Sequence, residues 1–327
     1  MNWQGKRVLV TGAGGFIASH LTERLVELGA RPRALVHYNA LGNWGWLDFS
    51  PRKGDIEVLA GDIADRDSVR SAVEGTDIVF HLAALIAIPY SYQAPASYVR
   101  TNIQGTLNVL QAVQEAKVER LVHTSTSEVY GTARYVPINE DHPLQGQSPY
   151  AASKIGADKM VEAFHCSFGV PAVTVRPFNT FGPRQSARAV IPTIISQALA
   201  GQVVRLGNLH PTRDLNYVAN TVEGFLLAAA EQRAIGQTIN FGSGREISIG
   251  DLVQLIARLL GKPIDVTSDQ ARLRPEKSEV ERLLADNSRA RSLLGWEPTI
   301  SLEVGLQRTL DWLREHQGRY RTGVYVV

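Results

Sequence analysis

Residues 7–18 read RVLVTGAGGFIA, and this stretch decides the fold. The apolar run 7–11 has the length of a buried β-strand, and a helical pattern over 16–28 follows the glycines directly. Glycines at such a junction permit a tight turn and let a phosphate approach the N-terminus of the following helix. Where the G-x-G-x-x-G pattern has its third glycine, this chain has Ala18, which is still small enough for close packing. The stretch therefore predicts the first strand, turn and helix of a dinucleotide-binding fold.

Downstream, short apolar runs alternate with helical patterns, which favours a parallel sheet with helices on both faces. We predict an α/β fold, a doubly wound parallel Rossmann sheet with a smaller C-terminal substrate-binding lobe. Residues 1–178 would form the dinucleotide-binding domain, 215–241 would return to it, and 179–214 and 242–327 would form the lobe. The expected further strands are 32–37, 56–60, 78–83, 121–126, 172–177 and 238–241, and the expected helices follow Asp65 or span 97–116, 150–168 and 216–230.

Composition excludes several classes of protein. The formal net charge is only +2 and no basic run is present, so we expect no nucleic-acid partner. The single cysteine, Cys166, excludes an intramolecular disulfide and a cysteine-rich metal site, and we expect it in the core. No apolar stretch approaches ~18 residues, so we expect no membrane span and no signal peptide, and a cytoplasmic location.

The cofactor site is predicted around the glycine turn and the ends of the neighbouring strands. Asp62 follows the strand 56–60, where a carboxylate can accept a hydrogen bond from an adenine amine. The sequence HLAA at 81–84 ends another strand with small residues, which allow the backbone to pass close to a ligand. The candidate cofactor-binding residues are Gly12, Gly15, Phe16, Ile17, His37, Asp62, Ile63, Leu82, Ala83, Thr101, Tyr150, Lys154 and Pro177.

The end of the second strand leaves the choice between NAD and NADP open. NAD-selective sites often place Asp or Glu there to bind the ribose 2′-hydroxyl. Here residues 36–39 read VHYN, without a carboxylate, and Arg33 and His37 could tolerate a 2′-phosphate.

Tyr150 and Lys154 form the expected catalytic pair. At i and i+4 of a predicted helix they share one face, and a nearby ammonium together with the positive charge of a nicotinamide would favour the phenolate of a general base. Ser125 and Thr126, at the end of the preceding strand, supply hydroxyl donors.

Together the glycine turn, HLAA, the Ser/Thr–Tyr–Lys set and RPFN at 176–179 resemble the extended short-chain dehydrogenases/reductases that act on nucleotide sugars. The resemblance covers nearly the whole chain. It implies bound NAD, a nucleotide diphosphate sugar as substrate, and a homodimer formed through the helices that begin near Ser97 and Tyr150. We expect no metal.

Within that family, TSTSEVYG at 124–131 resembles the GDP-mannose 4,6-dehydratases, which carry Thr-Ser-Glu where 4-epimerases generally carry small residues. WGW at 44–46 and IPYSY at 88–92 are similar to dehydratases of legionaminic-acid-type pathways, which act on N-acetylglucosamine nucleotides. The resemblance implies that Tyr150 removes the O4 proton, Thr126 holds O4, and Glu128 takes the C5 proton as water leaves C6. Ser127, a substrate contact, replaces the aspartic acid that some dehydratases use to protonate the leaving hydroxyl.

The C-terminal part also resembles these dehydratases, in LGNLHPTRD at 206–214 and at Arg274–Pro275. This similarity implies that Arg213 and Arg274 clamp the diphosphate, that Glu279 binds the nucleotide ribose, and that Asn179 contacts a phosphate or the sugar. Two other functions remain open: a 4-epimerase of a nucleotide hexose or hexuronate, and a dinucleotide-sensing scaffold, which would usually lack the Tyr or the Lys.

Overall fold

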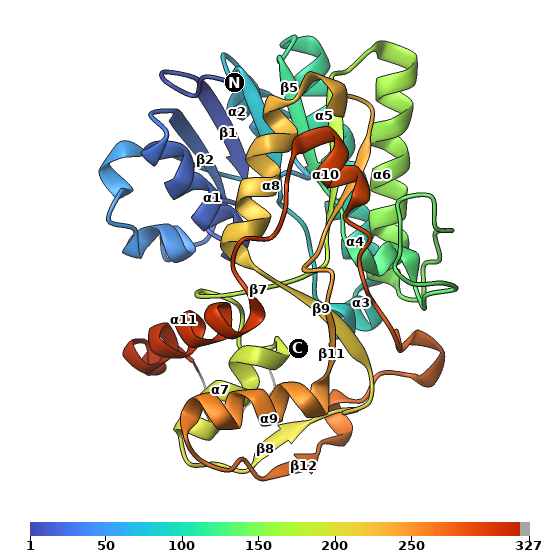
Figure 1. Cartoon of the computed structure of the whole chain (residues 1–327). Helices are drawn as coiled ribbons and strands as arrows, with labels where there is room; N and C mark the ends of the chain where they lie inside the picture. Colours follow the sequence, from blue (N-terminus) through green and yellow to red (C-terminus); the bar gives the residue numbers. More distant parts are fainter. Residues whose placement is uncertain (321–327) are drawn as a thin grey trace.

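The computed structural model describes residues 1–320, and its centre is a parallel sheet of seven strands in the order β10-β6-β5-β4-β1-β2-β3 (Figure 1). The order reverses direction beside β1, as a doubly wound dinucleotide fold requires. The predicted fold class is therefore confirmed. The strands are β1 (Arg7–Thr11), β2 (Arg31–His37), β3 (Glu57–Gly61), β4 (Ile78–His81), β5 (Arg120–Thr124), β6 (Ala172–Pro177) and β10 (Thr238–Phe241).

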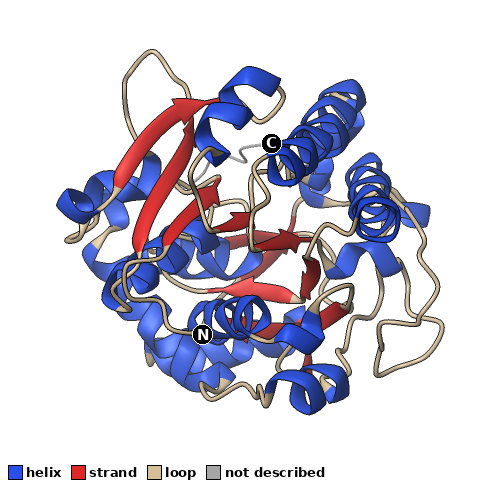
Figure 2. Ribbon diagram, turned by 90° about the horizontal axis from the view of Figure 1, so that it is seen from above, coloured by secondary structure: helices blue, strands red, loops and turns tan. Residues whose placement is uncertain are grey.

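Helices cover both faces of this sheet (Figure 2). One layer consists of α2 (Arg66–Val73), α5 (Gly105–Glu115) and α6 (Pro149–Phe168), which pack side by side. On the other face α1 (Phe16–Glu27) packs against α8 (Val218–Ala230), and α10 (Ser288–Leu294) packs against α8 and β10. A separate apolar cluster lies under each layer, because strands covered on both faces bury side chains on both faces.

Local capping explains where α6 begins and ends. The Ser148 side chain accepts a hydrogen bond from the Ala151 amide, and Pro149 occupies the first turn, where its missing N–H is not needed. Gly169, with φ +68°, ends the helix in the left-handed conformation. Tyr150 therefore lies in the first turn, facing the end of β5.

The smaller lobe lies below the sheet in Figure 1. It contains a three-stranded sheet, in which β9 lies between β7 and β11, and a two-stranded parallel pair, β8 with β12. The lobe elements are β7 (Asn179–Phe181), α7 (Val190–Leu199), β8 (Val204–Leu206), β9 (Thr212–Tyr217), β11 (Glu246–Ser248), α9 (Ile249–Leu260), β12 (Val266–Ser268) and α11 (Leu302–Glu315).

Two predicted helices differ from the structure. Asn216 and Tyr217 end β9 rather than opening α8, because the small sheet continues to Tyr217 through its pairing with Phe181. In place of one α-helix over 97–116, a helical run passes from α4 (Pro95–Tyr98) through a π-helical turn (Val99–Gln104) into α5.

The expected core position of Cys166 is wrong, since the residue is exposed. Helix α6 buries Val161 and Phe164 towards the sheet. Cys166 follows Phe164 by two residues and so points to nearly the opposite side.

The domain division remains a prediction, and residues 321–327 of the expected lobe lie outside the described residues. Within that expected lobe, α10 packs on elements of the main sheet. In the described part of the chain, no helix combines the length and apolarity needed to cross a membrane.

Candidate active site

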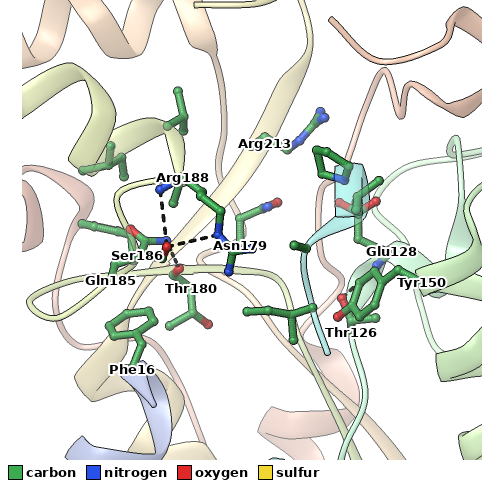
Figure 3. Close-up of a pocket in the computed structure, with 18 of the residues that line it drawn as sticks. Phe16, Thr126, Glu128, Tyr150, Asn179, Thr180, Gln185, Ser186, Arg188 and Arg213 are labelled. Carbon is green, nitrogen blue, oxygen red and sulfur yellow. Dashed lines mark hydrogen bonds between the residues drawn. The ribbon is translucent and has the colours of Figure 1, made fainter. Parts of the chain in front are cut away.

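A cavity of about 1110 Å³ lies between the carboxyl ends of the main-sheet strands and the lobe. In open α/β sheets, ligands bind at this edge, beside the point where the strand order reverses. The volume exceeds that of a site for one drug-sized ligand and is compatible with two ligands held end to end. In Figure 3, Phe16 lies on one side of this cavity. On the other side lie Thr126, Glu128 and Tyr150, and Asn179 lies between the two sides.

Most of the predicted site residues line this one cavity, although they come from segments far apart in the sequence. The residues brought together are Gly12, Gly15, Phe16, Ile17, Leu82, Ala83, Thr126, Ser127, Glu128, Tyr150, Lys154, Pro177, Asn179, Arg213, Arg274 and Glu279.

Four predicted cofactor residues do not line it. His37 is exposed at the end of β2, and Thr101 lies in the π-helical turn before α5. Asp62 accepts a hydrogen bond from the Ala64 amide at 2.9 Å, as a turn residue does. Ile63 is buried and its carbonyl accepts from Asn108. Their roles in cofactor binding remain predictions.

The suggestion that Arg33 tolerates a 2′-phosphate is wrong. Arg33 lies in the first half of β2, away from its carboxyl end. Its guanidinium donates to the carbonyls of Ala72 and Glu74 and pairs with Glu57 at 3.0 Å. These contacts hold the side chain on the opposite edge of the sheet from the cavity.

The glycine turn has the shape that a pyrophosphate requires. Gly12 has φ +70°, and a Cβ there would lie 2.8 Å from the Ala83 Cα. Gly15 precedes α1 without a side-chain cap, so the helix presents its first amides to the cavity. The Thr11 hydroxyl accepts from the amides of Leu82 and Ala83, which fixes the end of β4 against the turn.

The catalytic pair is buried beside the end of β5. Lys154 Nζ donates to the Thr124 carbonyl at 2.7 Å, and a hydrogen bond joins the side chains of Tyr150 and Thr126. The Tyr98 ring packs edge-on against Tyr150, with centroids 6.2 Å apart. The pair thus shares one helix face, as the spacing predicts.

In the protein alone, the pKa of Tyr150 is raised and not lowered. Burial raises the pKa of the phenol above its usual value, and the Thr126 hydrogen bond opposes this only in part. Burial also lowers the pKa of Lys154 to about 8, against the charge of Asp158. The Lys154 ammonium donates to a backbone carbonyl, so the predicted lowering of the phenol pKa by this ammonium together with a nicotinamide cation stays a prediction for the loaded protein.

Asp158 anchors a buried polar network below the catalytic pair, and no sequence motif indicated it. Its carboxylate accepts from Ser125 at 2.7 Å, from His123 at 3.2 Å and from Arg176 at 2.9 Å. Burial alone would raise the pKa of Asp158, but the His123 hydrogen bond and the Arg176 charge outweigh burial and hold it at about 2. The network ties α6, β5 and β6 together directly under the site.

Charged side chains line the opposite, lobe side of the cavity. Arg213, on β9, donates to the Thr212 carbonyl at 2.9 Å and to Glu279 at 3.3 Å. Arg274 Nη1 lies 4.0 Å from Glu128 Oε2 and 3.8 Å from Glu279 Oε1. Arg274 therefore links the predicted catalytic carboxylate of Glu128 to Glu279, which in turn contacts Arg213.

A comparison with known families decides the assignment. A family model described as GDP-mannose 4,6 dehydratase matches residues 9–309. The chain belongs to this family. Its members include extended short-chain dehydrogenases/reductases with the sheet and lobe seen here, so the resemblance inferred from the motifs is confirmed.

Relatives of this GDP-mannose dehydratase family member catalyse more than one reaction. The chain is 33% identical over 315 residues to a UDP-glucose 4-epimerase from Mycolicibacterium smegmatis, covering 94% of this chain and 98% of that protein. It is 32% identical over 330 residues to a dTDP-glucose 4,6-dehydratase from Xanthomonas campestris, covering 94% and 93%. A dTDP-glucose 4,6-dehydratase from Streptomyces venezuelae, solved with NAD and TYD bound, superposes with a TM-score of 0.85 at 30% identity, covering 96% and 99%. Family membership therefore supports an enzyme acting on nucleotide sugars.

Sequence reasoning missed several basic residues of the cavity wall. Arg184 and Arg188, in the loop before α7, line the cavity, and so does Arg319 near the C-terminus. In Figure 3, Arg188 lies beside Ser186, on the Phe16 side of Asn179. For Arg184 and Arg188, the glycine and proline of the loop 178–183 were a sequence signal that a loop at the site begins there. Arg319 had none, because only the tertiary fold brings it to the site.

Three segments join over the glycine turn in this family member. The Trp46 amide donates to the Gly14 carbonyl at 3.0 Å, and the Trp46 ring packs edge-on against Trp312 of α11 at 5.4 Å. The Tyr320 hydroxyl donates to the Gln185 carbonyl at 2.8 Å. Trp46, Gln185 and Tyr320 all line the cavity, so a clasp made of the loop after β2, the loop before α7 and the C-terminal segment borders the dinucleotide end.

Proposed function

We propose that this protein is a sugar-nucleotide 4,6-dehydratase, which converts a nucleotide hexose to its 4-keto-6-deoxy form. A nucleotide of N-acetylglucosamine is the first candidate substrate, from the similarity of residues 44–46 and 88–92. One observation carries the proposal: the cavity wall places the Glu128 carboxylate beside Thr126 and Tyr150. A 4-epimerase needs no second base, whereas a dehydratase does.

The dinucleotide end of the cavity supports NAD as the cofactor. The cradle at Gly12 and the uncapped N-terminus of α1 suit a pyrophosphate, and the structural relative from Streptomyces venezuelae contains NAD. NAD would accept a hydride from sugar C4 and return it at C6, so that no cofactor is consumed. The end of β2 carries no carboxylate, and NADP therefore stays an alternative to test.

Tyr150 is the proposed base for the sugar O4 proton, with the Thr126 hydroxyl as its hydrogen-bond partner. Burial keeps the phenol protonated in the protein itself, and the Lys154 ammonium and a nicotinamide cation would both favour its ionised form. Oxidation at C4 makes the C5 hydrogen acidic. Glu128 would take that proton and deliver it to the departing C6 hydroxyl, because the neighbouring Ser127 is too weak an acid. The proton that Tyr150 removed from O4 would replace the C5 hydrogen when the hydride returns to C6.

Arg213 and Arg274 are the proposed ligands of the substrate diphosphate, a task suited to guanidinium groups. Glu279 would bind the nucleotide ribose. Asn179 lies between the two ends of the cavity, and its side-chain oxygen is buried without a hydrogen-bond partner among the described residues. An O–H or N–H of the sugar or phosphate region would satisfy it.

A mass-spectrometric screen of UDP-, GDP-, CDP- and dTDP-sugars tests the proposal. A dehydratase yields a product lighter by one water, while a 4-epimerase yields an isomer of equal mass, as the Mycolicibacterium smegmatis relative would. An isomer without water loss would replace our proposal with the epimerase.

The variant Glu128→Gln tests the assigned role of the second base. It should abolish dehydration and leave C4 oxidation measurable through the absorbance of the reduced cofactor. Unchanged dehydration would show that Glu128 is not the base. A homodimer, inferred from the family resemblance, and a cytoplasmic location, inferred from the apolar pattern of the sequence, accompany this proposal.

A further inference from the structure

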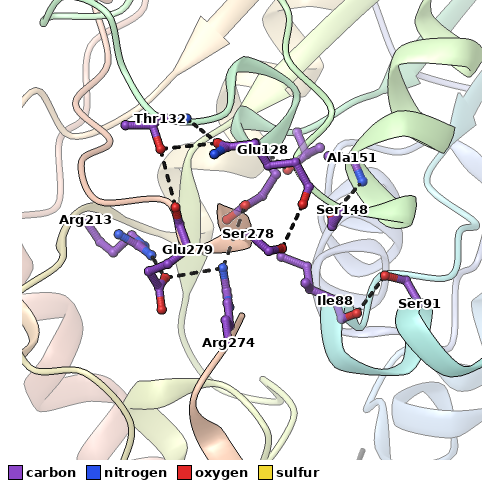
Figure 4. A network of polar contacts seen from close by, with 12 residues as sticks. Ile88, Ser91, Glu128, Thr132, Ser148, Ala151, Arg213, Arg274, Ser278 and Glu279 are labelled. Carbon is purple, nitrogen blue, oxygen red and sulfur yellow. Dashed lines mark hydrogen bonds and ion pairs between the residues drawn. The ribbon is translucent and has the colours of Figure 1, made fainter. Parts of the chain in front are cut away.

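The substrate end of the cavity holds two arginines and two glutamates with their charges in balance. Arg213, Glu279 and Glu128 have side chains only 9%, 10% and 11% exposed, and Arg274 is 25% exposed. Figure 4 shows Arg213 and Arg274 converging on Glu279. No further ion pair with Glu128 or Glu279 is found among the described residues, so the charges depend on one another.

Arg274 is the least firmly held member of this group. Its two carboxylate partners lie at 3.8 and 4.0 Å, beyond hydrogen-bond distance, and its buried Nη1 has no hydrogen-bond partner in the described structure. A guanidinium in this state can reorient towards a stronger acceptor at small cost, and a phosphate oxygen is such an acceptor.

A nucleotide diphosphate sugar would bring two negative charges to this balanced group. If Arg213 and Arg274 turn to the diphosphate, the carboxylates lose their counter-charges in a poorly hydrated wall, where an unpaired charge is costly. A carboxylate relieves this cost by taking up a proton. Glu279 contacts both arginines, at 3.3 and 3.8 Å, whereas Glu128 has one ion pair, at 4.0 Å, so Glu279 loses more.

We propose that substrate binding is coupled to proton uptake by Glu279, while Arg274 moves from the two carboxylates to the diphosphate and leaves Glu128 as an ionised, less strongly paired base. The groups that face Glu128 are Arg213 of β9, Arg274 and Glu279 of the segment 274–279, and Tyr150 of α6. Those that face Glu279 are the two arginines and Glu128. Arg274 is thus a positioning residue that makes Glu128 a stronger base only when substrate is bound. The inference rests on the proposed function.

Titration calorimetry tests the coupling in a Tyr150→Phe protein loaded with NAD, in which the chemistry cannot start. UDP-N-acetylglucosamine is titrated at about pH 6 in buffers of different ionisation enthalpy, whose slope gives the protons taken up. The diphosphate diester does not itself titrate in this range. We expect uptake of a substantial fraction of one proton, and an affinity that rises as the pH falls.

Matched variants locate the proton. Adding Glu279→Gln should remove the uptake, Glu279→Asp should retain it, and Glu246→Gln, in the exposed pair with Arg282, should leave it unchanged. Thermal melting checks that each variant is folded. An uptake that persists in Glu279→Gln, or binding with no uptake at all, overturns the coupling and leaves the proposed function intact.

The failure of the proposed function would look different. If UDP-N-acetylglucosamine, GDP-mannose and dTDP-glucose all fail to bind the Tyr150→Phe protein, the cavity is not a nucleotide-sugar site and both proposals fall together. In the active enzyme, Arg274→Lys should restore part of the dehydration rate lost in Arg274→Gln, measured as kcat at saturating substrate.

Discussion

The dinucleotide end of the cavity is formed mainly by backbone, whereas the substrate end is formed by charged side chains. At the dinucleotide end, glycines and strand ends expose backbone amides, and the critical distance is 2.8 Å from a hypothetical Gly12 Cβ to the Ala83 backbone. At the substrate end, long charged side chains form ion pairs: Arg213 lies 3.3 Å from Glu279, and Arg274 lies 4.0 Å from Glu128. A backbone site has one shape, whereas a side-chain site can exchange partners when a ligand arrives.

The first prediction concerns the dinucleotide end, where the backbone sets the shape of the site. Gly12→Ala should reduce dinucleotide affinity by about a hundredfold or more, because its Cβ would collide with backbone at a φ of +70° and backbone strain alone costs about 1–3 kcal/mol. The dinucleotide content of the purified protein measures the effect.

Gly201→Ala is the matched control for this prediction. Gly201 has a similar φ of +69°, but an added Cβ would meet nothing within 4 Å. It should lower the melting temperature slightly and leave the dinucleotide content unchanged. Equal losses in both variants would mean that conformational strain, and not the close approach to Ala83, explains the result.

The second prediction addresses the adaptable end. Arg213→Lys should raise KM for the nucleotide sugar by roughly 10- to 100-fold, since a charged hydrogen bond contributes about 1.5–3 kcal/mol. Lysine cannot form the two parallel hydrogen bonds that a guanidinium group makes to a phosphate. Steady-state kinetics measure it, with dinucleotide content unaffected. Arg205→Lys, on the exposed middle residue of β8, is the control and should change neither quantity. A loss of bound dinucleotide in Arg213→Lys would contradict the separation of the two ends.

The third and smallest effect concerns Lys154, where the two ends meet. Burial lowers its pKa to about 8, so activity that needs the ammonium should fall about tenfold per pH unit above that value. Lys154→Arg, which stays charged, should lose this alkaline limb in a pH–rate profile at saturating substrate.

Stability should change in the opposite sense over the same range. Between about 8 and the usual pKa of 10.5, the unfolded chain binds more protons at this lysine than the folded protein does. The contribution of Lys154 to the free energy of unfolding therefore rises with pH through that window. Urea unfolding of the wild type against Lys154→Met isolates it.

The sequence was sufficient wherever function follows from a local pattern. The strands Arg7–Thr11, Ala172–Pro177 and Thr238–Phe241 were predicted to the residue, because short apolar runs there end at turn or glycine signals. The Tyr150–Lys154 pair and the glycine turn were recognisable for the same reason, since each lies within a few residues of chain.

What the sequence could not give depends on contacts between distant segments. The burial of Asp158 and its bonds to His123 and Arg176 arise only when three elements pack. Arg319 reaches the cavity wall from near the C-terminus, and a carbonyl of α2 holds Arg33 away from the cavity. The burial that raises the pKa of Tyr150 is likewise a property of the assembled fold.

The clasp over the glycine turn bears on how long a dinucleotide stays bound between catalytic cycles. These contacts border the dinucleotide end, so we expect them to slow the release of a bound dinucleotide. For an oxidoreductase that discharges a spent cofactor after each cycle, such closure would limit turnover. A dehydratase that restores its own oxidant in every cycle has no spent cofactor to discharge, so a long residence time of the dinucleotide is compatible with rapid catalysis.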